Sequence, residues 1–527
     1  MEPALDENSL NLIGYTASFC QVFGSIFAAR HLRYISNKKI VSLFGGSSFS
    51  LPEGGRTLQK WGLDGIIVVG SGEGPLHNLL EFTLKHEETS ASRYMGSVEA
   101  ENIVNVIRIG QAHKPVELAM SKSYMRSLPD PSFDDYFEQL KLLCSDHKAY
   151  QYACENFVSL PLEGSRGCFA KCDFCHNPNI TSDFTTLTGV QVAERSLRMA
   201  EKYGVKDITF VDSVCNTWAE GYADRLLDKE AYMHAFMELR VHAPEIFWTK
   251  LALSGATALQ LGIEAISDPL LTSMRKGTSV MQNLAATKYM AEMGTKDASN
   301  LIIYHPRSTV DDVEETKRVM KLLEHFPVFH LSRFVVSYAS PIYNELSDDK
   351  KNELNRGFDW LPRELEAYGW PRHLSYTWPN KWSSKHSIQA WANFQKWYEE
   401  HTRNLDKLEI TPEFNVEKQN DRLLFFDTRF NETKTYTLND DYAEIYNLCH
   451  APQRMSRLVR STNIPKSKIE DILINLTERK SLIKVNDTYL SIAIRPKSEL
   501  IQNYLAKRES KSVNLPLKTS TDIHTVL

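Results

Sequence analysis

The sequence predicts an α/β protein, because short apolar strands alternate with helices in two separate stretches of the chain. The first stretch covers residues 1–110 and the second covers residues 155–345 of the 527. Apolar strands joined by helical crossovers are typical of parallel sheets. A third pattern between residues 405 and 496, in which two hairpins flank three helices, predicts a smaller domain near the carboxyl terminus.

The amino-terminal stretch predicts a doubly wound parallel sheet. Strands are expected at residues 12–16, at Lys39–Gly46 and at the start of Asp64–Gly74, with a helix over Phe19–His31 after the first strand. The third strand runs into the turn Gly70–Gly74, where the lack of side chains would let a ligand approach the backbone. A tight turn is the simpler explanation of the same glycines.

Residues 155–345 predict a second parallel sheet, in the form of a six-stranded (β/α) barrel. A helix over Val190–Tyr203 lies between the first two strands, and such barrels carry their active groups at the carboxyl ends of the strands. The six expected strands are Phe157–Leu162, Asp207–Asp212, Glu245–Lys250, Ala258–Glu264, Asn300–Tyr304 and His330–Val336.

The other segments complete the domain organisation. Residues 111–154 are a linker, and residues 346–404 are a helical, aromatic-rich extension that holds six of the nine tryptophans. We expect this extension to pack on the barrel. Residues 497–527 are polar and rich in lysine and serine, which predicts a loose tail.

Residues 405–496 resemble a winged helix-turn-helix domain. A hairpin over residues 423–438 comes first, and a second hairpin turns at Asn486–Asp487. The low net charge of this region argues against DNA as its partner. The three helices between the hairpins are expected at Asp440–Cys449, Met455–Ser461 and Lys466–Glu478.

The overall composition is that of an ordinary globular protein. Hydrophobic residues make up 42% and charged residues 24% of the chain, and the formal net charge of −5 gives no indication of nucleic-acid binding. The segment 12–29 carries no charge, but its glycines and polar side chains favour a strand and a helix over a membrane span. With no signal peptide and scattered cysteines, we expect a cytoplasmic protein without a membrane partner.

Three cysteines carry the strongest chemical signal in the chain. Cys168, Cys172 and Cys175 have the spacing C-x3-C-x2-C, so three thiolates can converge on one metal centre. Four-iron clusters take cysteine ligands, normally four, and a set of three leaves one iron open. A zinc site that includes His176 is the alternative, but zinc sites usually combine two separated cysteine pairs. Eight cysteines in a chain of this length are not a disulfide scaffold.

This spacing, with Phe174 just before the third cysteine, resembles the signature of the radical S-adenosylmethionine (SAM) superfamily. The resemblance implies a partial, open barrel and a [4Fe–4S] cluster whose open iron binds SAM. It also implies cleavage of SAM to a 5'-deoxyadenosyl radical, with electrons from a reductant such as flavodoxin or ferredoxin.

The same resemblance assigns roles to residues at the strand ends. Asp212 would contact the SAM ammonium group, with a helix cap as the structural alternative. Glu264 would hold Arg275 or Lys276 near the SAM carboxylate, with a structural salt bridge as the alternative. Pro306 lies in a loop expected to surround the adenine.

Two further segments resemble one branch of that superfamily, the enzymes that modify ribosomally made peptides. The sequences FGGSSFS and DGIIVVGSGEGPLHNLL resemble the second half of a cobalamin-binding domain, and LQLGIEAIS followed by MRKGTS resembles the barrel of that branch. The front half of the cobalamin domain and its Asp-x-His-x-x-Gly motif are missing, so cobalamin is the less favoured cofactor. The winged-helix domain would bind the leader of a precursor peptide, by strand addition.

Within this branch, a peptide epimerase of the proteusin type is the favoured function. Such an enzyme abstracts an α-hydrogen and returns a hydrogen atom from a thiol, for which Cys215 and Cys449 are the candidates. The weaker candidates are Cys20, Cys144 and Cys154. A cobalamin-dependent C-methyltransferase is the alternative, and a leader-binding scaffold with a structural cluster is the alternative of another class.

Overall fold

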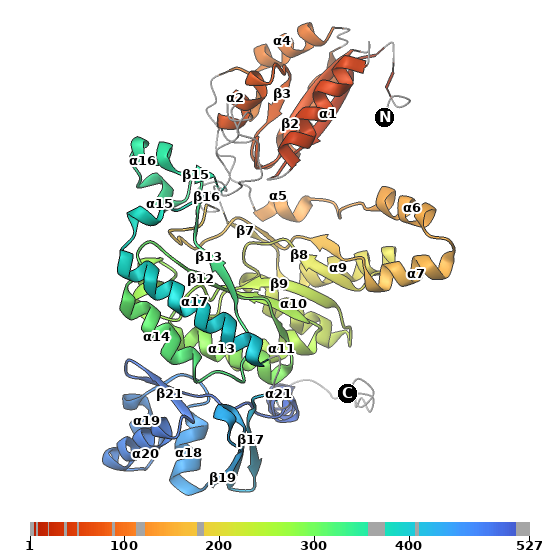
Figure 1. Cartoon of the computed structure of the whole chain (residues 1–527). Coiled ribbons are helices and arrows are strands. Elements are labelled where there is room, and N and C mark those ends of the chain that lie inside the picture. Colours follow the sequence, from red (N-terminus) through yellow and green to blue (C-terminus); the bar gives the residue numbers. More distant parts are fainter. Residues whose placement is uncertain are drawn as a thin grey trace. The chain divides into compact units, whose positions relative to one another are not determined.

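The computed structural model describes residues 5–6, 9–18, 21–35, 39–49, 52–86, 90–111, 122–176, 184–356, 375–405 and 411–512. The chain divides into two compact units (Figure 1). The first unit contains residues 1–126, 166–185 and 334–379, and the second contains residues 127–165, 186–333 and 380–527.

A four-stranded sheet forms the amino-terminal part of the first unit. β1 (Asn11–Thr16), β2 (Ile40–Gly45) and β3 (Ile66–Val68) are parallel, and β4 (Val106–Arg108) runs antiparallel to β3. The strand order β1–β2–β3–β4 follows the chain. The three predicted strands are therefore confirmed, but the described strands contain no reversal of order at which ligand crevices usually form in such sheets.

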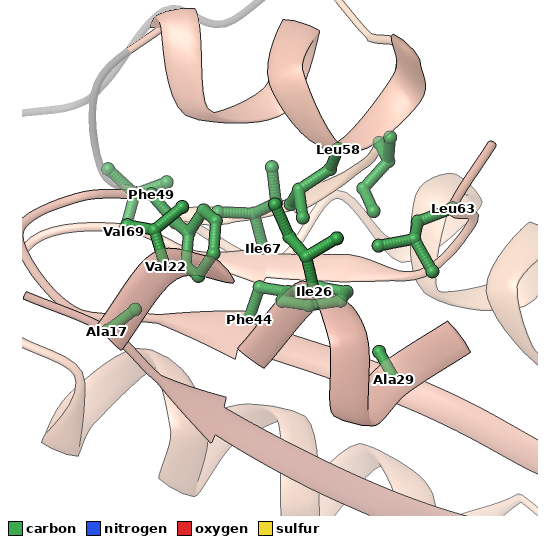
Figure 2. Close-up of a cluster of buried hydrophobic side chains, with 11 residues drawn as sticks. Ala17, Val22, Ile26, Ala29, Phe44, Phe49, Leu58, Leu63, Ile67 and Val69 are labelled. Carbon is green, nitrogen blue, oxygen red and sulfur yellow. The ribbon is translucent and has the colours of Figure 1, made fainter. Parts of the chain in front are cut away.

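Helices cover both faces of this sheet. α1 (Gln21–Ile35) and α2 (Pro52–Lys60) contribute to the hydrophobic cluster around Phe44, which Figure 2 shows. α3 (Glu73–Lys85) and α4 (Ala91–Glu101) contribute to a second cluster around Val41. Because Val41 and Phe44 are both fully buried, the sheet is closed on its two faces.

The rest of the first unit contains shorter elements. Its second sheet has the antiparallel order β14–β16–β15, and Tyr343 of α15 stacks on Tyr376 at 5.9 Å between ring centroids. The cysteine loop lies between two short strands. The bounds are β6 (Ser165–Arg166), β7 (Thr185–Thr186), β14 (Val335–Ser337), α15 (Pro341–Asn344), α16 (Asp348–Glu353), β15 (Asn355–Arg356) and β16 (Ser375–Thr377).

The second unit is built on parallel strands in chain order. A five-stranded sheet has the order β11–β10–β9–β8–β5, β12 pairs with β13, and an isolated parallel bridge joins Glu264 to Leu301 of β12. The strands are β5 (Leu160–Leu162), β8 (Asp207–Phe210), β9 (His234–Leu239), β10 (Ala258–Leu261), β11 (Lys296–Asp297), β12 (Asn300–Ile303) and β13 (His330–Arg333).

Helices alternate with these strands. Thr188 and Ser279 cap α9 and α13 in capping boxes, which satisfy backbone N–H groups at the helix starts. The helices are α6 (Asp134–Leu143), α7 (His147–Asn156), α9 (Gly189–Tyr203), α10 (Asn216–Asp228), α11 (Glu245–Leu253), α12 (Asp268–Ser273), α13 (Val280–Met293), α14 (Val310–Met320) and α17 (Lys385–Leu405), and a 3-10 turn, η3, covers Asn380–Trp382. The helix α5 (Lys122–Ser127) belongs, up to Arg126, to the first unit.

Side chains on the two faces of this parallel sheet have different environments. On one face Phe210 of β8 is buried and packs against Trp218 and Tyr222 of α10. The side chains that alternate with the buried ones are only half-buried, and we call their side the open face. It carries Thr209, Phe236, Glu238, Gln260 and Ile302. Parallel sheets are usually buried on both sides, so the open face is the exception.

The carboxyl-terminal part of the second unit confirms both predicted hairpins and all three helices. A strand that the sequence did not predict, β17 (Phe414–Gln419), completes the first hairpin as a three-stranded sheet. The remaining elements are β18 (Arg422–Asp427), η4 (Arg429–Asn431), β19 (Lys434–Leu438), α18 (Asp440–Leu448), β20 (Gln453–Arg454), α19 (Met455–Ser461), α20 (Lys466–Glu478), β21 (Leu482–Val485) and β22 (Thr488–Ser491). Their identity as a winged-helix domain stays a prediction, as does the open-barrel form of the parallel strands.

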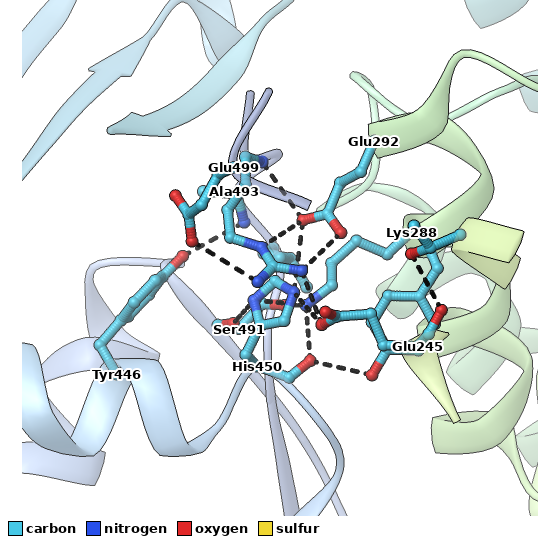
Figure 3. A network of polar contacts seen from close by, with 12 residues as sticks. Glu245, Lys288, Glu292, Tyr446, His450, Ser491, Ala493 and Glu499 are labelled. Carbon is cyan, nitrogen blue, oxygen red and sulfur yellow. Dashed lines mark hydrogen bonds and ion pairs between the residues drawn. The ribbon is translucent and has the colours of Figure 1, made fainter. Parts of the chain in front are cut away.

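A buried polar network joins this carboxyl-terminal part to α11 and α13 (Figure 3). Arg495 donates to Glu292 of α13 at 3.0 Å and to Glu245 of α11 at 2.8 Å. Lys288 donates to the backbone oxygen of His450 at 2.7 Å, and burial lowers the pKa of Lys288 to about 7. Removing one of these side chains would leave a buried charge without its counter-charge. The network therefore favours the packed arrangement of the carboxyl-terminal part on α11 and α13.

Three predictions about the elements are wrong. The predicted strand His330–Val336 is two strands, β13 and β14, which belong to different sheets. Glu245–Lys250 begins the helix α11, because Pro244 at the cap and Glu245 in the first turn favour a helix start over a strand. The strand is instead β9, His234–Leu239. The expected loose tail contains the helix α21 (Lys497–Ser512), where Leu500 and Tyr504 are buried one turn apart. Residues 513–527 lie outside the described part of the chain.

The predicted helical extension 346–404 is helical in α17, whose Trp391 and Phe394 are fully buried, but the same range also contains the strands β15 and β16 of the first unit. Trp360 and Trp370 of the same extension lie outside the described residues. Of the helices that the structure describes, none is both long and apolar enough to cross a membrane.

Candidate active site

The cysteine loop presents three thiols on a short stretch of backbone. Cys172 is buried, Cys168 and Cys175 are partly exposed, and none of the three forms a disulfide. The N–H of Cys175 donates to the carbonyl of Cys172 at 3.3 Å, which closes a turn between them. No three described histidine, cysteine, aspartate or glutamate side chains converge as a single-ion site. A cubane cluster takes one thiolate on each iron, so this donor set fits a [4Fe–4S] cluster.

An ion pair links the cysteine loop to the amino-terminal sheet within the first unit. The guanidinium of Arg166 lies 2.6 Å from the carboxylate of Glu73, in the turn Gly70–Gly74 that follows β3. Burial alone would raise the pKa of Glu73, but the hydrogen bond and charge of Arg166 hold it below its usual range. The glycine-rich turn therefore lies next to the start of the cysteine loop.

In the second unit, Asp212 anchors the backbone that leads into the cysteine loop. Its carboxylate accepts hydrogen bonds from Gly164 N–H at 3.0 Å, from the Ser165 hydroxyl at 2.5 Å and from the Trp218 indole at 2.9 Å. Burial raises the pKa of Asp212, and these donors oppose the shift. A Cβ at Gly164 would lie 2.6 Å from the Trp218 ring, so only glycine fits there.

These contacts change the interpretation of Asp212. The helix cap considered as its structural role is wrong, because Cys215 is the cap residue of α10. The predicted contact with the SAM ammonium group stays a prediction. What the geometry establishes is that Asp212 fixes Gly164 and Ser165, which precede the cysteine loop in the chain, to the end of β8.

Glu264 and Lys276 form an ion pair after the end of β10. The ammonium of Lys276 lies 2.8 Å from the Glu264 carboxylate, and Lys276 is 6% exposed. Gly262 leaves the room for this ammonium, because a Cβ there would lie 2.5 Å from Lys276 Nζ. Of the two predicted basic partners, Lys276 is thus paired with Glu264. Arg275 is exposed.

Glu238 is a site residue that the sequence reasoning missed. It lies on the open face at the end of β9, opposite Gln260 in the strand register. Burial raises the pKa of Glu238, and the negative charges of Glu264 and Asp212 add to the shift while Lys276 opposes it. The sequence does contain an acidic residue near the end of the alternating apolar run 234–239, which could have indicated a strand-end carboxylate. It was missed because the strand was predicted at 245–250 instead.

The remaining predicted cofactor contacts lie near the strand ends. Pro306 is half-buried and follows β12, two residues after Tyr304, whose backbone has a φ of 60°. Glu264 also has a left-handed backbone, with a φ of 59°. A left-handed backbone at a residue other than glycine is a form of local strain that often occurs at functional sites. Phe174 is half-buried in the cysteine loop.

The two candidate hydrogen-atom donors are both fully buried thiols. Cys215 caps α10, and burial raises its pKa well above the ordinary value. Cys449 ends α18, and burial raises its pKa to about 12. Each is therefore a neutral thiol within a packed interior, and a donor role would need movement to expose it. Cys20 lies outside the described residues.

A family model decides what this arrangement is. The model described as the radical SAM superfamily matches residues 162–320, which contain the cysteine loop and the parallel strands from β8 to β12. The chain carries a radical SAM superfamily domain. A domain of this superfamily implies a [4Fe–4S] cluster and SAM.

Relatives and solved structures extend this result. A protein of Pyrococcus horikoshii named an uncharacterised methyltransferase is 22% identical over 329 residues, and the match covers 60% of this chain. A protein of Methanocaldococcus jannaschii named as a methylthiotransferase is 26% identical over 193 residues, 34% of this chain. The matches span 64% and 42% of these two relatives.

Two solved structures share the fold at low sequence identity. The cobalamin-dependent SAM radical enzyme OxsB with aqua-cobalamin has a TM-score of 0.53 at 15% identity, over 98% of this chain and 74% of OxsB. The radical SAM methyltransferase TsrM from Kitasatospora setae, with cobalamin and a [4Fe–4S] cluster, also has a TM-score of 0.53 at 15% identity, over 74% of this chain and 80% of TsrM. These likenesses establish the fold.

Proposed function

We propose that this radical SAM enzyme is a cobalamin-dependent C-methyltransferase that acts on a ribosomally made peptide. The observation that carries the proposal is the Arg166–Glu73 ion pair, which brings a glycine-rich turn of the amino-terminal sheet to the cysteine loop. The carboxyl end of such a sheet is where ligands bind in open α/β folds. The names of the relatives and the cobalamin of the structural neighbours support the same choice over the epimerase.

The strand ends of the amino-terminal sheet fit the approach of a large cofactor. A Cβ at Gly70 or Gly72 would meet no atom nearer than 3.8 Å, so the turn is not filled by its own surroundings. The segment Gly45–Ser48 at the end of β2 also consists of small residues. These two segments would hold the corrinoid, which supplies the transferable methyl group when bound. The chain has no Asp-x-His-x-x-Gly motif, so no histidine of that motif would ligate cobalt.

The second unit supplies groups for SAM. Asp212, Glu238 and Glu264 contribute carboxylates near the strand ends, and Lys276 contributes a cation. An excess of carboxylates suits the ammonium and sulfonium groups of SAM, while Lys276 suits its carboxylate. The cluster, bound by Cys168 and its two partners, supplies the electron. In this proposal the strands form a partial, open (β/α)6 barrel.

The peptide partner is part of the same proposal. The hairpins and three helices of residues 411–494 have the order of a winged-helix domain, and such a domain could bind a leader peptide by adding a strand at an exposed edge. We further propose flavodoxin or ferredoxin as the reductant.

Anaerobic turnover tests the function directly. The reconstituted enzyme is incubated with SAM, reductant, methylcobalamin and precursor peptide, and the peptide mass is measured. A gain of one CH2 unit that depends on methylcobalamin is expected. The same reaction in deuterated water separates the chemistries, since a gain of one deuterium without methylation would establish epimerisation instead.

The epimerase remains a second candidate because one observation favours it. Among its described residues, the amino-terminal sheet has only three parallel strands and no reversal of strand order. Its strand ends therefore offer a corrinoid a smaller binding surface than a full cobalamin domain would. Against it, Cys215 and Cys449 are fully buried. If no 5'-deoxyadenosine forms at all, both enzyme functions fail and the scaffold hypothesis would stand.

A further inference from the structure

A pocket of about 550 Å³ lies in the second unit, away from the strand-end carboxylates described above. Its wall comes from α14 and the residues after it, from α17, and from the carboxyl-terminal domain. Its volume falls in the range of binding pockets for small molecules and peptide side chains. The lining residues that matter are Lys317, Lys321, Glu324, Trp397, Phe430 and Lys480.

One buried guanidinium holds three parts of this pocket in place. Arg429 is 1% exposed and forms two hydrogen bonds to the Asp427 carboxylate, at 2.9 and 2.8 Å. It also donates to the carbonyl of Leu322 at 3.1 Å and to that of Lys480 at 3.0 Å. Hydrogen bonds of this one side chain therefore connect the turn after β18 to the segment after α14 and to the end of α20. Because these segments are already fixed, the pocket wall should lose little conformational entropy when a ligand binds.

The turn after β18 is also strained. Phe430 has a φ of 61°, a left-handed conformation that is unusual for an aromatic residue. Its N–H donates to the Glu324 carboxylate at 3.4 Å, and its ring is only half-buried. The surrounding contacts thus hold the backbone of Phe430 in an unfavourable conformation and keep its ring in the pocket.

Three lysines surround the aromatic rings of the pocket. The ammonium groups of Lys317 and Lys321 lie 5.4 and 5.9 Å from the centroid of the Trp397 ring, and that of Lys480 lies 4.0 Å from Phe430. Within the part of the chain that the structure describes, none of these three lysines is within ion-pair distance of a carboxylate. Like charges gathered around two rings repel one another, and a bound anion would relieve that repulsion.

The composition of the wall indicates the chemical class of the anion. Phosphate sites usually rely on bidentate arginine or on backbone N–H groups at a helix start. Arg318 also lines this pocket, but its guanidinium is paired with Glu315 at 2.6 Å, so the cations left for a ligand are the lysines beside the rings. Glu314 and Glu324 also line it, which disfavours a dense polyanion. Carboxylates spaced by apolar side chains match lysines spaced by aromatic rings.

We propose that this pocket binds an acidic, aromatic-containing segment of the peptide substrate. The carboxylates pair with Lys317, Lys321 and Lys480, and an aromatic side chain packs on Trp397 or Phe430. The inference rests on the proposed peptide substrate and adds a docking site for it that is separate from the winged-helix strand edge.

Binding of a defined probe tests the site without any catalysis. The probe is a fluorescein-labelled hexapeptide of alternating glutamate and phenylalanine, and its matched control has glutamine in place of each glutamate. Fluorescence anisotropy with the full chain is expected to give at least about tenfold weaker binding of the glutamine peptide. Binding of the acidic probe is also expected to weaken with added salt, because lysine–carboxylate pairs at a half-open site are screened.

Variants locate the binding in the pocket. The double substitution Lys317→Glu with Lys321→Glu should weaken binding of the acidic probe about tenfold or more. The matched double substitution Lys385→Glu with Lys396→Glu changes the charge equally on exposed positions of α17 outside the pocket, and should leave binding unchanged. Thermal unfolding of each variant verifies that it is folded.

Several results would overturn the proposal. Equal binding of the two peptides, equal loss in the two double variants, or displacement of the probe by inorganic tripolyphosphate at lower concentration would each do so. Formation of 5'-deoxyadenosine from SAM without peptide separates this test from the proposed function. The pocket variant should retain that uncoupled cleavage, whereas its absence in the wild-type chain would refute the enzyme function and leave the binding result standing.

Discussion

The two parallel sheets of this protein are built by the same local rules but use their faces differently. The sheet of β1–β4 is covered on both sides, with Val41 and Phe44 fully buried on opposite faces. The five-stranded sheet of β5, β8, β9, β10 and β11 has one buried side, and its open face carries half-buried polar residues such as Thr209, Glu238 and Gln260. A closed sheet can offer a ligand only its strand ends, whereas an open face offers a whole surface.

The largest expected effect tests whether the chemistry depends on the cysteine loop. Cys172→Ala should abolish the iron–sulfur absorbance of the reconstituted protein and all 5'-deoxyadenosine formation, because it removes one of three cluster ligands. Cys144→Ala, outside the loop, is the control and should retain both. Retention of the cluster absorbance in the Cys172 variant would show that the loop does not hold the cluster.

A matched pair of substitutions tests the comparison of the sheets itself. Phe44→Ala removes a fully buried ring from the closed sheet and should lower the free energy of unfolding by about 3–5 kcal/mol. Phe236→Ala removes a half-buried ring from the open face, where solvent replaces part of the lost contact, and should cost less than about 1.5 kcal/mol. Denaturant unfolding measures both. Similar losses in the two variants would mean that the open face is packed after all.

Glu238→Gln tests whether the open face recognises a cation. We expect the affinity of the unreduced, reconstituted enzyme for SAM to fall about tenfold, the effect of losing one charge-assisted interaction of roughly 1.5 kcal/mol. Since the pKa of Glu238 is raised by burial and by Glu264, the wild-type affinity should increase as pH rises through that pKa. The variant should show no such increase. Isothermal titration calorimetry across pH measures both curves.

The same carboxyl gives a stability prediction with a definite sign. A raised pKa means that the folded state binds the proton more tightly than the unfolded state, so wild-type stability falls as pH rises between the two pKa values. Glu238→Gln removes this loss and should be more stable than the wild type above that interval. A variant that is less stable at neutral pH would show that Glu238 is held by contacts rather than strained by burial.

Much of the fold was predictable because its signals are local. The hairpin at Asn486–Asp487 and the helix Met455–Ser461 follow from turn chemistry and hydrophobic period, and the structure confirms both. The error at Glu245 arose because six residues with apolar and β-branched members satisfy both a strand and a short helix. The preceding proline decided the outcome, and that signal was overlooked.

The candidate site was only partly predictable because it depends on pairs distant in the chain. The three cluster cysteines lie within eight residues and carry their own signature. In contrast, the use of Asp212 depends on Gly164 and Trp218, and only the folded chain brings those groups together. The pairing of Lys276 rather than Arg275 with Glu264 likewise follows from the space left by Gly262.

The smallest expected effect concerns the ion pair that connects the closed sheet to the cysteine loop. Glu73 is 37% exposed and Arg166 is 25% exposed, so solvent screens the pair and its coupling free energy should be no more than about 1 kcal/mol. A double-mutant cycle with Glu73→Gln and Arg166→Gln measures that coupling by denaturant unfolding. Because the pKa of Glu73 is lowered in the folded state, the coupling should be present at neutral pH and disappear as pH falls through that pKa. A coupling of zero at neutral pH would mean that the turn Gly70–Gly74 does not hold its place beside the loop. The cobalamin assignment would then lose the contact that carries it, and the closed sheet would be a support without a ligand.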